Sequence, residues 1–364
     1  MILSGGGTGG HIYPGLAVAR ALRPGTDLLY IGVRGRMDEA LVRAAGLPFA
    51  SVRAGPLRVG SPLGMLRGLA DLLAGTAQAW RLLGRLRPDA VFATGGYASV
   101  PVGVAAWLRR LPLLVYLPDV RPGWAVRLLA RLATRVAATT ERSLAELPAG
   151  KTEATGYPVR EAFRSADRDG ARRALGLPLD AQVLLVSGAS SGARSLNLAV
   201  EAQLDALLDV CHVVHVTGRA DEAELLACRE ALPEAKRARY HVYGYLEDPP
   251  AGPARMADAM FAADLAVLRS GASVLGELPA AGLPAVLVPG VYEGGYDQRA
   301  NARYLYEYGA AVILENDSLG HLSNLVRELL SDGDRRRAMG EAARRLAQPD
   351  AAQRLAQMLE ELAA

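Results

Sequence analysis

Cysteine is scarce in this chain, and its two cysteines, Cys211 and Cys228, form no pattern typical of a metal or redox site. Cys211 lies within the apolar run VCHVVHV. We therefore expect both to be free thiols in a reducing compartment. No basic leader with an apolar core and a cleavage site precedes the first glycines, so we expect the protein to stay in the cytoplasm.

Lysine is also scarce, because Lys151 and Lys236 are the only lysines among the 41 basic residues. We interpret this as a compositional bias toward arginine. The net charge is only +3, which does not by itself imply a nucleic acid. We expect no nucleic-acid partner.

Long charge-free segments are rare, and the nearest approach to a membrane span is residues 90–108. This segment has nearly the length needed to cross hydrocarbon. Its first half, however, contains Thr94, Gly95, Gly96, Ser99 and Pro101. A strand, a glycine turn and a helix explain it better than a transmembrane helix.

The 364 residues exceed what one hydrophobic core usually supports, so two domains are expected. Strand-like runs alternate with helical ones, a pattern that predicts a parallel, doubly wound α/β sheet, and the pattern occurs twice. The runs are residues 1–3, 28–33, 88–94, 112–118 and 135–139, then 181–188, 212–218, 239–244, 264–270 and 284–290.

Residues 155–178 are polar and rich in Arg, Gly and Pro, so they indicate a linker that runs into the second domain. Asp167 and Asp169 form an Asp-x-Asp pair, but their place before a helical run favours a helix cap over a metal site. We assign no metal. The last thirty or so residues predict one or two amphipathic helices with a break near Pro349.

The most informative motif is the glycine-rich turn SGGGTGGHIYP, residues 4–14, between a short strand and a helix. Glycines allow positive φ and the close approach of a ligand, and the helix start offers free N–H groups. Gly5, Gly7 and Gly10 also match the dinucleotide pattern G-x-G-x-x-G. The second strand ends in Arg34 rather than in an acid, which disfavours a nicotinamide enzyme.

A second glycine turn follows a strand at residues 188–197. Ser190, Ser191 and the amides of the helix start suit a pyrophosphate, and Arg194 could add charge. A serine-capped helix without a ligand is the alternative.

Two further motifs carry polar side chains that suit a sugar. In RSGASVLGE, residues 269–277, we expect Glu277 about two turns along a helix, where its carboxylate could accept both hydroxyls of a ribose. Gln298 and Asn301 lie three residues apart on one face of the next helix and suit sugar hydroxyls, although simple capping would also explain them. All these turns follow parallel strands, where open α/β sheets bind ligands. Two such sheets facing a cleft favour group transfer from a nucleotide.

Six motifs in this order strongly resemble the MurG family over nearly the whole chain. They are GGTGGHIYPGLAVA (6–19), GGYASVP (95–101), SSGARSLN (190–197), RSGASVLGE (269–277), AAGLPAVLVP (280–289) and DQRANA (297–302). That family transfers N-acetylglucosamine from UDP-N-acetylglucosamine to the lipid-linked muramyl-peptide intermediate of peptidoglycan synthesis. The resemblance implies an inverting, metal-independent transferase without a cofactor.

The resemblance also implies a GT-B fold, with two Rossmann-like doubly wound domains facing a cleft. Residues 1–158 would bind the acceptor and associate with the membrane, and residues 159–345 would bind the UDP sugar. A C-terminal helix, about residues 346–364, would pack back on the first domain. The protein would lie peripherally on the cytoplasmic face of the cell membrane.

Site residues follow by position from the same resemblance. His11 is the best-placed base, with a pKa class suited to neutral pH, and Asp119 is a second catalytic candidate. A structural role for His11 at the glycine turn stays open. Glu277 would hold the ribose, Leu246 the uracil through its backbone, and Gln298 the sugar hydroxyls. The UDP-sugar set is Thr8, Gly9, Gly10, Arg160, Ser190, Ser191, Gly192, Leu246, Ser270, Gly271, Glu277, Gln298 and Asn301. The acceptor set is Gly6, Gly7, Thr8, Gly95, Gly96, Tyr97 and Asp119.

The chain departs from the family pattern at two places. Tyr116, Leu117, Pro118 and Asp119 stand where the family usually has His-Glu-Gln-Asn, so Asp119 could act in place of the asparagine. Ser191 stands where glutamine is usual. The departure motivates an alternative, a transferase of the same fold with another lipid acceptor such as diacylglycerol. A catalytically silent binding partner of envelope enzymes is a third hypothesis.

Residues 53–87 combine arginines with large apolar side chains, which suits docking on an anionic bilayer. The only acid is Asp71. If the leucines face the sheet instead, this is an ordinary core helix, and both interpretations stay open. The basic members are Arg53, Arg58, Arg67, Arg81, Arg85 and Arg87, and the apolar ones are Leu63, Met65, Leu66, Leu69, Leu72, Leu73 and Trp80.

Overall fold

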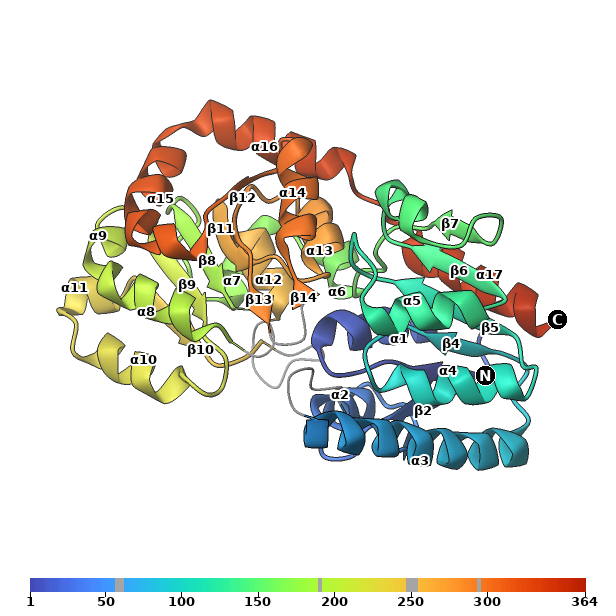
Figure 1. The fold of residues 1–364 in the computed structure, drawn as a ribbon. Helices are drawn as coiled ribbons and strands as arrows, with labels where there is room; N and C mark the ends of the chain where they lie inside the picture. Colours follow the sequence, from blue (N-terminus) through green and yellow to red (C-terminus); the bar gives the residue numbers. More distant parts are fainter. Residues whose placement is uncertain (56–61, 189–191, 247–254, 293–295) are drawn as a thin grey trace. The chain divides into compact units, whose positions relative to one another are not determined.

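The computed structural model describes residues 1–55, 62–188, 192–246, 255–292 and 296–364, and these form two compact units (Figure 1). Unit 1 comprises Met1–Arg160, Val291–Tyr296 and Gln348–Ala364, and unit 2 comprises Glu161–Gly290 and Asp297–Ala347. Each unit is built on its own parallel sheet. The expected pair of doubly wound α/β domains is therefore confirmed.

The sheet of unit 1 has the strand order β3-β2-β1-β4-β5-β6-β7, and neighbouring strands are parallel. Its strands are β1 (Ile2–Ser4), β2 (Leu29–Gly32), β3 (Phe49–Ser51), β4 (Val91–Ala93), β5 (Leu113–Leu117), β6 (Arg135–Ala138) and β7 (Thr152–Ala154). The direction of winding reverses between β1 and β4. At such a switch point the loops after the strands separate and leave room for a ligand.

Alternate side chains of the unit 1 strands face opposite layers of helices. Ile2 and Val91 pack in one core with α3, α4 and α5, whereas Leu3 and Phe92 pack in another with α1, α2 and α17. Figure 1 shows α3 and α4 side by side along one face of this sheet. The helices are α1 (Gly9–Ala21), α2 (Met37–Ala44), α3 (Pro62–Leu86), α4 (Ser99–Leu108), α5 (Trp124–Leu132), α17 (Ala351–Ala363) and the 3-10 turn η1 (Glu141–Glu146).

The sheet of unit 2 has the order β10-β9-β8-β11-β12-β15, again with parallel neighbours, and its switch point lies between β8 and β11. Its strands are β8 (Val183–Ser187), β9 (His212–Val216), β10 (Tyr240–Tyr243), β11 (Leu265–Arg269), β12 (Ala285–Val288) and β15 (Ala311–Ile313). A separate two-stranded ribbon pairs β13 (Val291–Tyr292) with β14 (Tyr296–Asp297).

Helices α8, α9 and α15 share a buried core with the strands of the unit 2 sheet. This core includes Leu184, Leu196, Leu207 and Val326. The helices of this unit are α6 (Ala162–Ser165), α7 (Arg168–Ala174), α8 (Arg194–Ala202), α9 (Leu204–Leu208), α10 (Glu222–Glu230), α11 (Glu234–Arg237), α12 (Met256–Ala262), α13 (Val274–Ala281), α14 (Arg299–Glu307), α15 (Leu322–Ser331), α16 (Gly333–Arg345) and the 3-10 turn η2 (Asn316–His321).

Every strand expected from the sequence is present, but the edge strands β3, β7 and β15 were missed. Each is only three residues long and partly exposed. The apolar run AAVIL, residues 310–314, was the available signal for β15. Residues 90–108 form β4, a glycine turn and α4, as predicted. Among the described residues, no helix is both long and apolar enough to span a bilayer. The break near Pro349 separates α16 from α17, also as predicted.

The linker interpretation of residues 155–178 is wrong over most of that segment. From Glu161 onward it belongs to unit 2 and forms α6 and α7. Asp167 caps α7 by accepting the Gly170 N–H at 2.8 Å, as expected. Arg172, on the same helix, is fully buried despite its charge. Polarity alone was misleading here because this guanidinium is paired inside the unit.

Arg172 ties α7 to the start of β8 and to the end of α12. Its guanidinium donates to Asp264 Oδ2 at 2.9 Å and to the Ala262 and Pro178 carbonyls, both at 3.1 Å. The same Asp264 oxygen accepts the Val183 N–H at 2.8 Å. Burial is the largest influence on this guanidinium and lowers its pKa.

We expect Arg172→Met to destabilise unit 2 by about 3 kcal/mol or more, because it removes one partner of a buried pair and several donors together. Arg168→Met is the matched control. Arg168 bonds the other oxygen of Asp264 but is 47% exposed, so it should cost about 1 kcal/mol or less. Urea unfolding followed by circular dichroism measures both values. Equal, small losses would show that the buried contacts do not stabilise the unit.

Candidate active site

The first glycine turn follows β1 and packs against the turn that follows β4, at the switch point of unit 1. A Cβ on Gly96, which has φ of +74°, would lie 2.2 Å from the Gly6 carbonyl oxygen. The ring of Tyr97 lies beside Gly7. Only glycine permits this contact at residue 96, so the structure brings together Gly6, Gly7, Gly95, Gly96 and Tyr97 from the acceptor set.

His11 lies in the first turn of α1 and faces the same place. Its Nδ1 is 3.0 Å from Thr8 Oγ1, and its ring packs against the backbone of Gly95. Burial lowers the pKa of His11 below its usual 6.5, and the nearby carboxylates of Asp119 and Asp38 raise it in part. The imidazole is therefore neutral at neutral pH and can accept a proton. The hydrogen bond to Thr8 equally serves the structural role that the sequence left open.

The chain segment that departs from the family pattern is largely internal. Tyr116 and Leu117 are buried in β5, and the Tyr116 hydroxyl lies 2.6 Å from Thr139 Oγ1. The Pro118 carbonyl accepts from the same Thr139 hydroxyl at 2.8 Å. Asp119, past the strand end, is 6% exposed and is the carboxylate whose charge acts most strongly on His11.

Asp38, which the sequence analysis missed, stabilises the first glycine turn by a hydrogen bond to its backbone. Its carboxylate is 1% exposed and accepts the Gly7 N–H at 3.3 Å and the Val33 N–H at 3.1 Å. A Cβ on Gly6 would lie 2.4 Å from Asp38 Oδ2. The available signal was an acid in the first turn of the helix after the second strand, close to the switch point.

Arg160 is the last residue of the first segment of unit 1 and is 7% exposed. Its guanidinium carbon lies 4.4 Å from the centre of the Tyr13 ring, on α1. Stacking on an aromatic face holds a guanidinium in one orientation. Thr8, Gly9 and Gly10, also assigned to the UDP sugar by resemblance, stand at the start of the same helix.

In unit 2, Glu277 lies in the first turn of α13 rather than two turns along it, because the helix begins at Val274. The expected position on the helix was therefore wrong. The side chain is 4% exposed, so it is not the solvated face residue that a lone Glu would ordinarily be. A carboxylate near a helix N-terminus is stabilised by the helix dipole.

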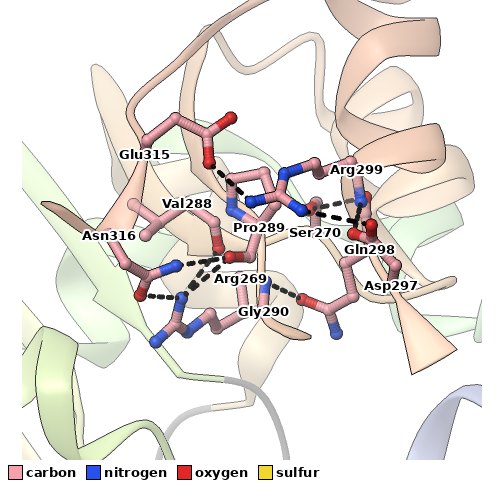
Figure 2. Close-up of polar contacts among 10 residues, drawn as sticks. All are labelled: Arg269, Ser270, Val288, Pro289, Gly290, Asp297, Gln298, Arg299, Glu315 and Asn316. Atoms are coloured by element: carbon pink, nitrogen blue, oxygen red, sulfur yellow. Dashed lines mark hydrogen bonds and ion pairs between the residues drawn. The ribbon is translucent and has the colours of Figure 1, made fainter. Parts of the chain in front are cut away.

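Gln298 forms hydrogen bonds with the residues that follow β11 and β12. Its side-chain oxygen accepts the Gly290 N–H at 3.0 Å, as Figure 2 shows, and its NH₂ group faces Gly271. The Ser270 hydroxyl donates to the Gln298 carbonyl at 3.1 Å. Asn301 donates to the Ser270 carbonyl at 3.0 Å. The structure thus brings together Ser270, Gly271, Gln298 and Asn301, and it leaves the Gln298 amide as a donor directed at the glycine turn.

The second glycine turn is described from Gly192 onward, and Ser190 and Ser191 lie outside the described residues. Gly192 has φ of +75°, and a Cβ there would lie 2.6 Å from the Thr217 carbonyl oxygen. Arg194, which the sequence suggested as extra charge for a pyrophosphate, is paired with Asp221 and Glu224 of the neighbouring loop and helix. Its charge is thus balanced within the unit.

Arg269, the last residue of β11, holds several loops of unit 2 together. The sequence analysis included it in a motif but predicted no role for it. Figure 2 shows its guanidinium between Val288, Pro289 and Asn316. Its Nη2 also donates to Ser195 Oγ, in α8, at 2.7 Å. It therefore connects the carboxyl ends of β11 and β12 with α8 and η2. A buried strand-end arginine beside a glycine turn was the signal for it.

These two switch points define the class of the protein, and comparison with known families agrees. Residues 1–138 match the glycosyltransferase family 28 N-terminal domain, and residues 183–355 match the glycosyltransferase family 28 C-terminal domain. The fold and the match identify a glycosyltransferase with the GT-B architecture, a hexosyltransferase.

Similar proteins identify the family within this class of glycosyltransferases. The chain is 44% identical to the UDP-N-acetylglucosamine–N-acetylmuramyl-(pentapeptide) pyrophosphoryl-undecaprenol N-acetylglucosamine transferase of Roseiflexus sp., over 94% of this chain and 90% of that protein. It is 40% identical to the Salinibacter ruber protein of the same name, over 94% and 91%. The crystal structure of Acinetobacter baumannii MurG matches with a TM-score of 0.72 and 26% identity over 99% of both chains. The chain belongs to the MurG family of glycosyltransferases.

Proposed function

We propose that this protein transfers N-acetylglucosamine from UDP-N-acetylglucosamine to undecaprenyl-pyrophosphoryl-muramyl-pentapeptide, the step from lipid I to lipid II in peptidoglycan synthesis. The observation that carries the proposal is the pair of switch points. Each sheet ends there in glycine turns that open helices, with a neutral histidine in unit 1 and a buried carboxylate and an amide donor in unit 2.

The donor is assigned to residues 159–345. Glu277 accepts the ribose hydroxyls, the Gln298 amide donates to a sugar hydroxyl, and Asn301 holds the Ser270 carbonyl beneath them. Amides at the start of α8, with Ser190, Ser191 and Gly192, receive the diphosphate. Leu246 presents backbone groups to uracil. The resemblance also assigns to the UDP sugar four residues of unit 1, namely Arg160, Thr8, Gly9 and Gly10.

The acceptor is assigned to residues 1–158, with α17 packed on that domain. The acceptor hydroxyl attacks the anomeric carbon as the bond to the UDP oxygen breaks, so the configuration inverts in one step. His11 takes the hydroxyl proton, and Asp119 stabilises the imidazolium that forms. Negative charge grows on the β-phosphate, where the helix amides stabilise it. No step of this reaction requires a metal ion.

The long helix α3 supplies a surface for membrane docking. On its buried side, Leu83 packs in the core with the sheet and Leu72 packs against α4 and α5. A neighbouring side exposes Leu66 at 65%, Leu69 at 49% and Leu73 at 64%. The buried side is that of an ordinary core helix, and the exposed side supports the docking interpretation. The same segment carries exposed arginines, namely Arg53, Arg67, Arg81, Arg85 and Arg87, while Arg58 lies outside the described residues. We infer that residues 53–87 dock peripherally on the anionic cytoplasmic face of the cell membrane.

Replacing both Leu66 and Leu69 with Asp should reduce binding to vesicles that contain anionic lipid by about tenfold or more, because two apolar side chains no longer enter the interface. Flotation with vesicles measures it. Leu179→Asp, at an exposed leucine of unit 2, is the matched control and should bind normally. Undiminished binding by the double variant, with an unchanged melting temperature, would exclude this side of α3 as the docking surface.

The acceptor is tested by a turnover assay with labelled UDP-N-acetylglucosamine and a panel of purified lipids. We expect the muramyl-pentapeptide lipid to be glycosylated and diacylglycerol to remain unmodified, because the relatives are named for the muramyl-pentapeptide acceptor. Preference for diacylglycerol would assign the other acceptor. No turnover with any lipid would favour the silent binding partner.

A further inference from the structure

The start of α10 is held in place by a buried polar network beside the second glycine turn. Asn197 Nδ2 donates to the Thr217 carbonyl at 2.8 Å and to Asp221 Oδ2 at 2.7 Å. Its Oδ1 must then accept from His215 Nε2, at 3.1 Å, and His215 Nδ1 accepts from the Tyr240 hydroxyl at 2.9 Å. Each polar atom of this relay has a partner, so the arrangement is rigid.

Protonation does not disturb the relay near neutral pH. Burial lowers the pKa of His215 to about 3, against a smaller opposing influence of the Asp221 carboxylate. Asp221 stands at the N-cap of α10, yet its side chain caps no backbone N–H of that helix. It bonds Asn197 and Arg194 instead, at 2.7 and 3.2 Å. The residue after it, Glu222, is therefore anchored to the core of unit 2.

Glu222 holds the segment that follows β10. Its Oε1 accepts the Gly244 N–H at 3.0 Å, and its carboxylate lies so close that a Cβ on Gly244 would stand 2.1 Å from Oε2. Arg219, in the same loop before α10, lies over the Tyr245 ring at 5.7 Å. Leu246 follows directly and is 6% exposed. The loop and first turn of α10 thus contact the two residues before Leu246.

We propose that Glu222 is a positioning residue for nucleobase recognition: by gripping Gly244 it sets where the backbone of Leu246 stands, and so determines the preference for uracil. This inference rests on the proposed function, because it takes the base to lie at Leu246. Backbone groups discriminate uracil from cytosine only if they are correctly placed, since the two bases differ in donor and acceptor pattern at N3 and at C4. If the segment around Leu246 moves, the contacts specific to uracil are therefore weakened more than the other contacts to the nucleotide.

Calorimetric titration of the full chain with UDP and with CDP tests this. Glu222→Ala should weaken UDP binding by about tenfold or more, the loss expected for one charge-assisted hydrogen bond that orders a binding segment. CDP binding should change much less, so the preference for UDP falls. Glu222→Gln, which keeps an acceptor oxygen, should lose less. Glu230→Ala, at the exposed far end of α10, is the control and should bind as the unaltered protein does.

Gly244→Ala gives a second, independent route to the same displacement, because its Cβ would strike the Glu222 carboxylate. Combined with Glu222→Ala, it should cost little more than Glu222→Ala alone, because the colliding group is gone. Equal losses for UDP and CDP, an unchanged UDP affinity, or additive losses in the double variant would overturn the inference. An unaltered protein that fails to bind UDP would instead refute the proposed function itself.

Discussion

A His11→Gln variant should lose about a hundredfold or more of its turnover while it binds UDP-N-acetylglucosamine with unchanged affinity. General-base catalysis contributes this much when a side chain takes a proton in the transition state. Glutamine can keep a hydrogen bond to Thr8 Oγ1, which lies 3.0 Å from His11 Nδ1, but it cannot take the proton. The variant therefore separates the catalytic role from the structural one.

Steady-state kinetics with saturating donor measure this loss, and calorimetry measures donor binding. If His11 only supports the glycine turn, His11→Gln should retain most of its turnover. Turnover that stays within a few fold of the unaltered protein would assign His11 a structural role.

The pH dependence of turnover should show where His11 titrates. Burial lowers its pKa below 6.5, so the base is fully available at neutral pH and is lost only as the pH falls through that lowered value. Asp119→Asn removes a charge that raises this pKa. The acidic limb of the profile should therefore move to lower pH in that variant. A limb that stays in place, or moves upward, would contradict the assignment of His11 as the titrating base.

Glu277→Ala should weaken UDP binding by about a hundredfold or more, the second large effect. A carboxylate that accepts two ribose hydroxyls makes two charge-assisted hydrogen bonds, each worth about 1.5–3 kcal/mol. Glu277 is 4% exposed and stands in the first turn of α13. It is the one acidic residue of that turn, so no neighbour there can replace its carboxylate. Calorimetric titration with UDP measures the change.

A chemical control identifies the contact. The unaltered protein should bind UDP more tightly than 2′-deoxy-UDP, and Glu277→Ala should bind both equally, because the acceptor of the 2′-hydroxyl is gone. Glu328→Ala removes an exposed carboxylate of α15 and should leave both affinities unchanged. If Glu277→Ala keeps the preference for UDP at an unchanged melting temperature, Glu277 does not hold the ribose.

The sequence predicted the central strands because they are buried on both sides and read as apolar runs, such as LLVYL in β5. It missed β3, β7 and β15, which are edge strands of three residues each and so leave only a short pattern in the sequence. It also placed Glu277 too far along its helix, since the first residue of α13 depends on how the turn after β11 closes.

The glycine turns were predictable, but their supports were not. Asp38 and Arg269 are buried charged residues whose partners lie far away in the sequence, at Gly7 and at Asn316. Local spacing places both residues near the glycine turns but does not reveal these contacts. Helix α3 shows the same limit, because sequence periodicity gives an apolar helix but cannot say which leucines the rest of the unit covers.

The central claim, direct displacement of UDP by the hydroxyl of a lipid-borne muramyl sugar, is tested most directly by proton NMR of the product. The purified protein, supplied with UDP-N-acetylglucosamine, muramyl-pentapeptide lipid and excess chelator, should form a β-linked disaccharide at its full rate. An α-linked product, or a product that forms only when a divalent metal is restored, would contradict the account.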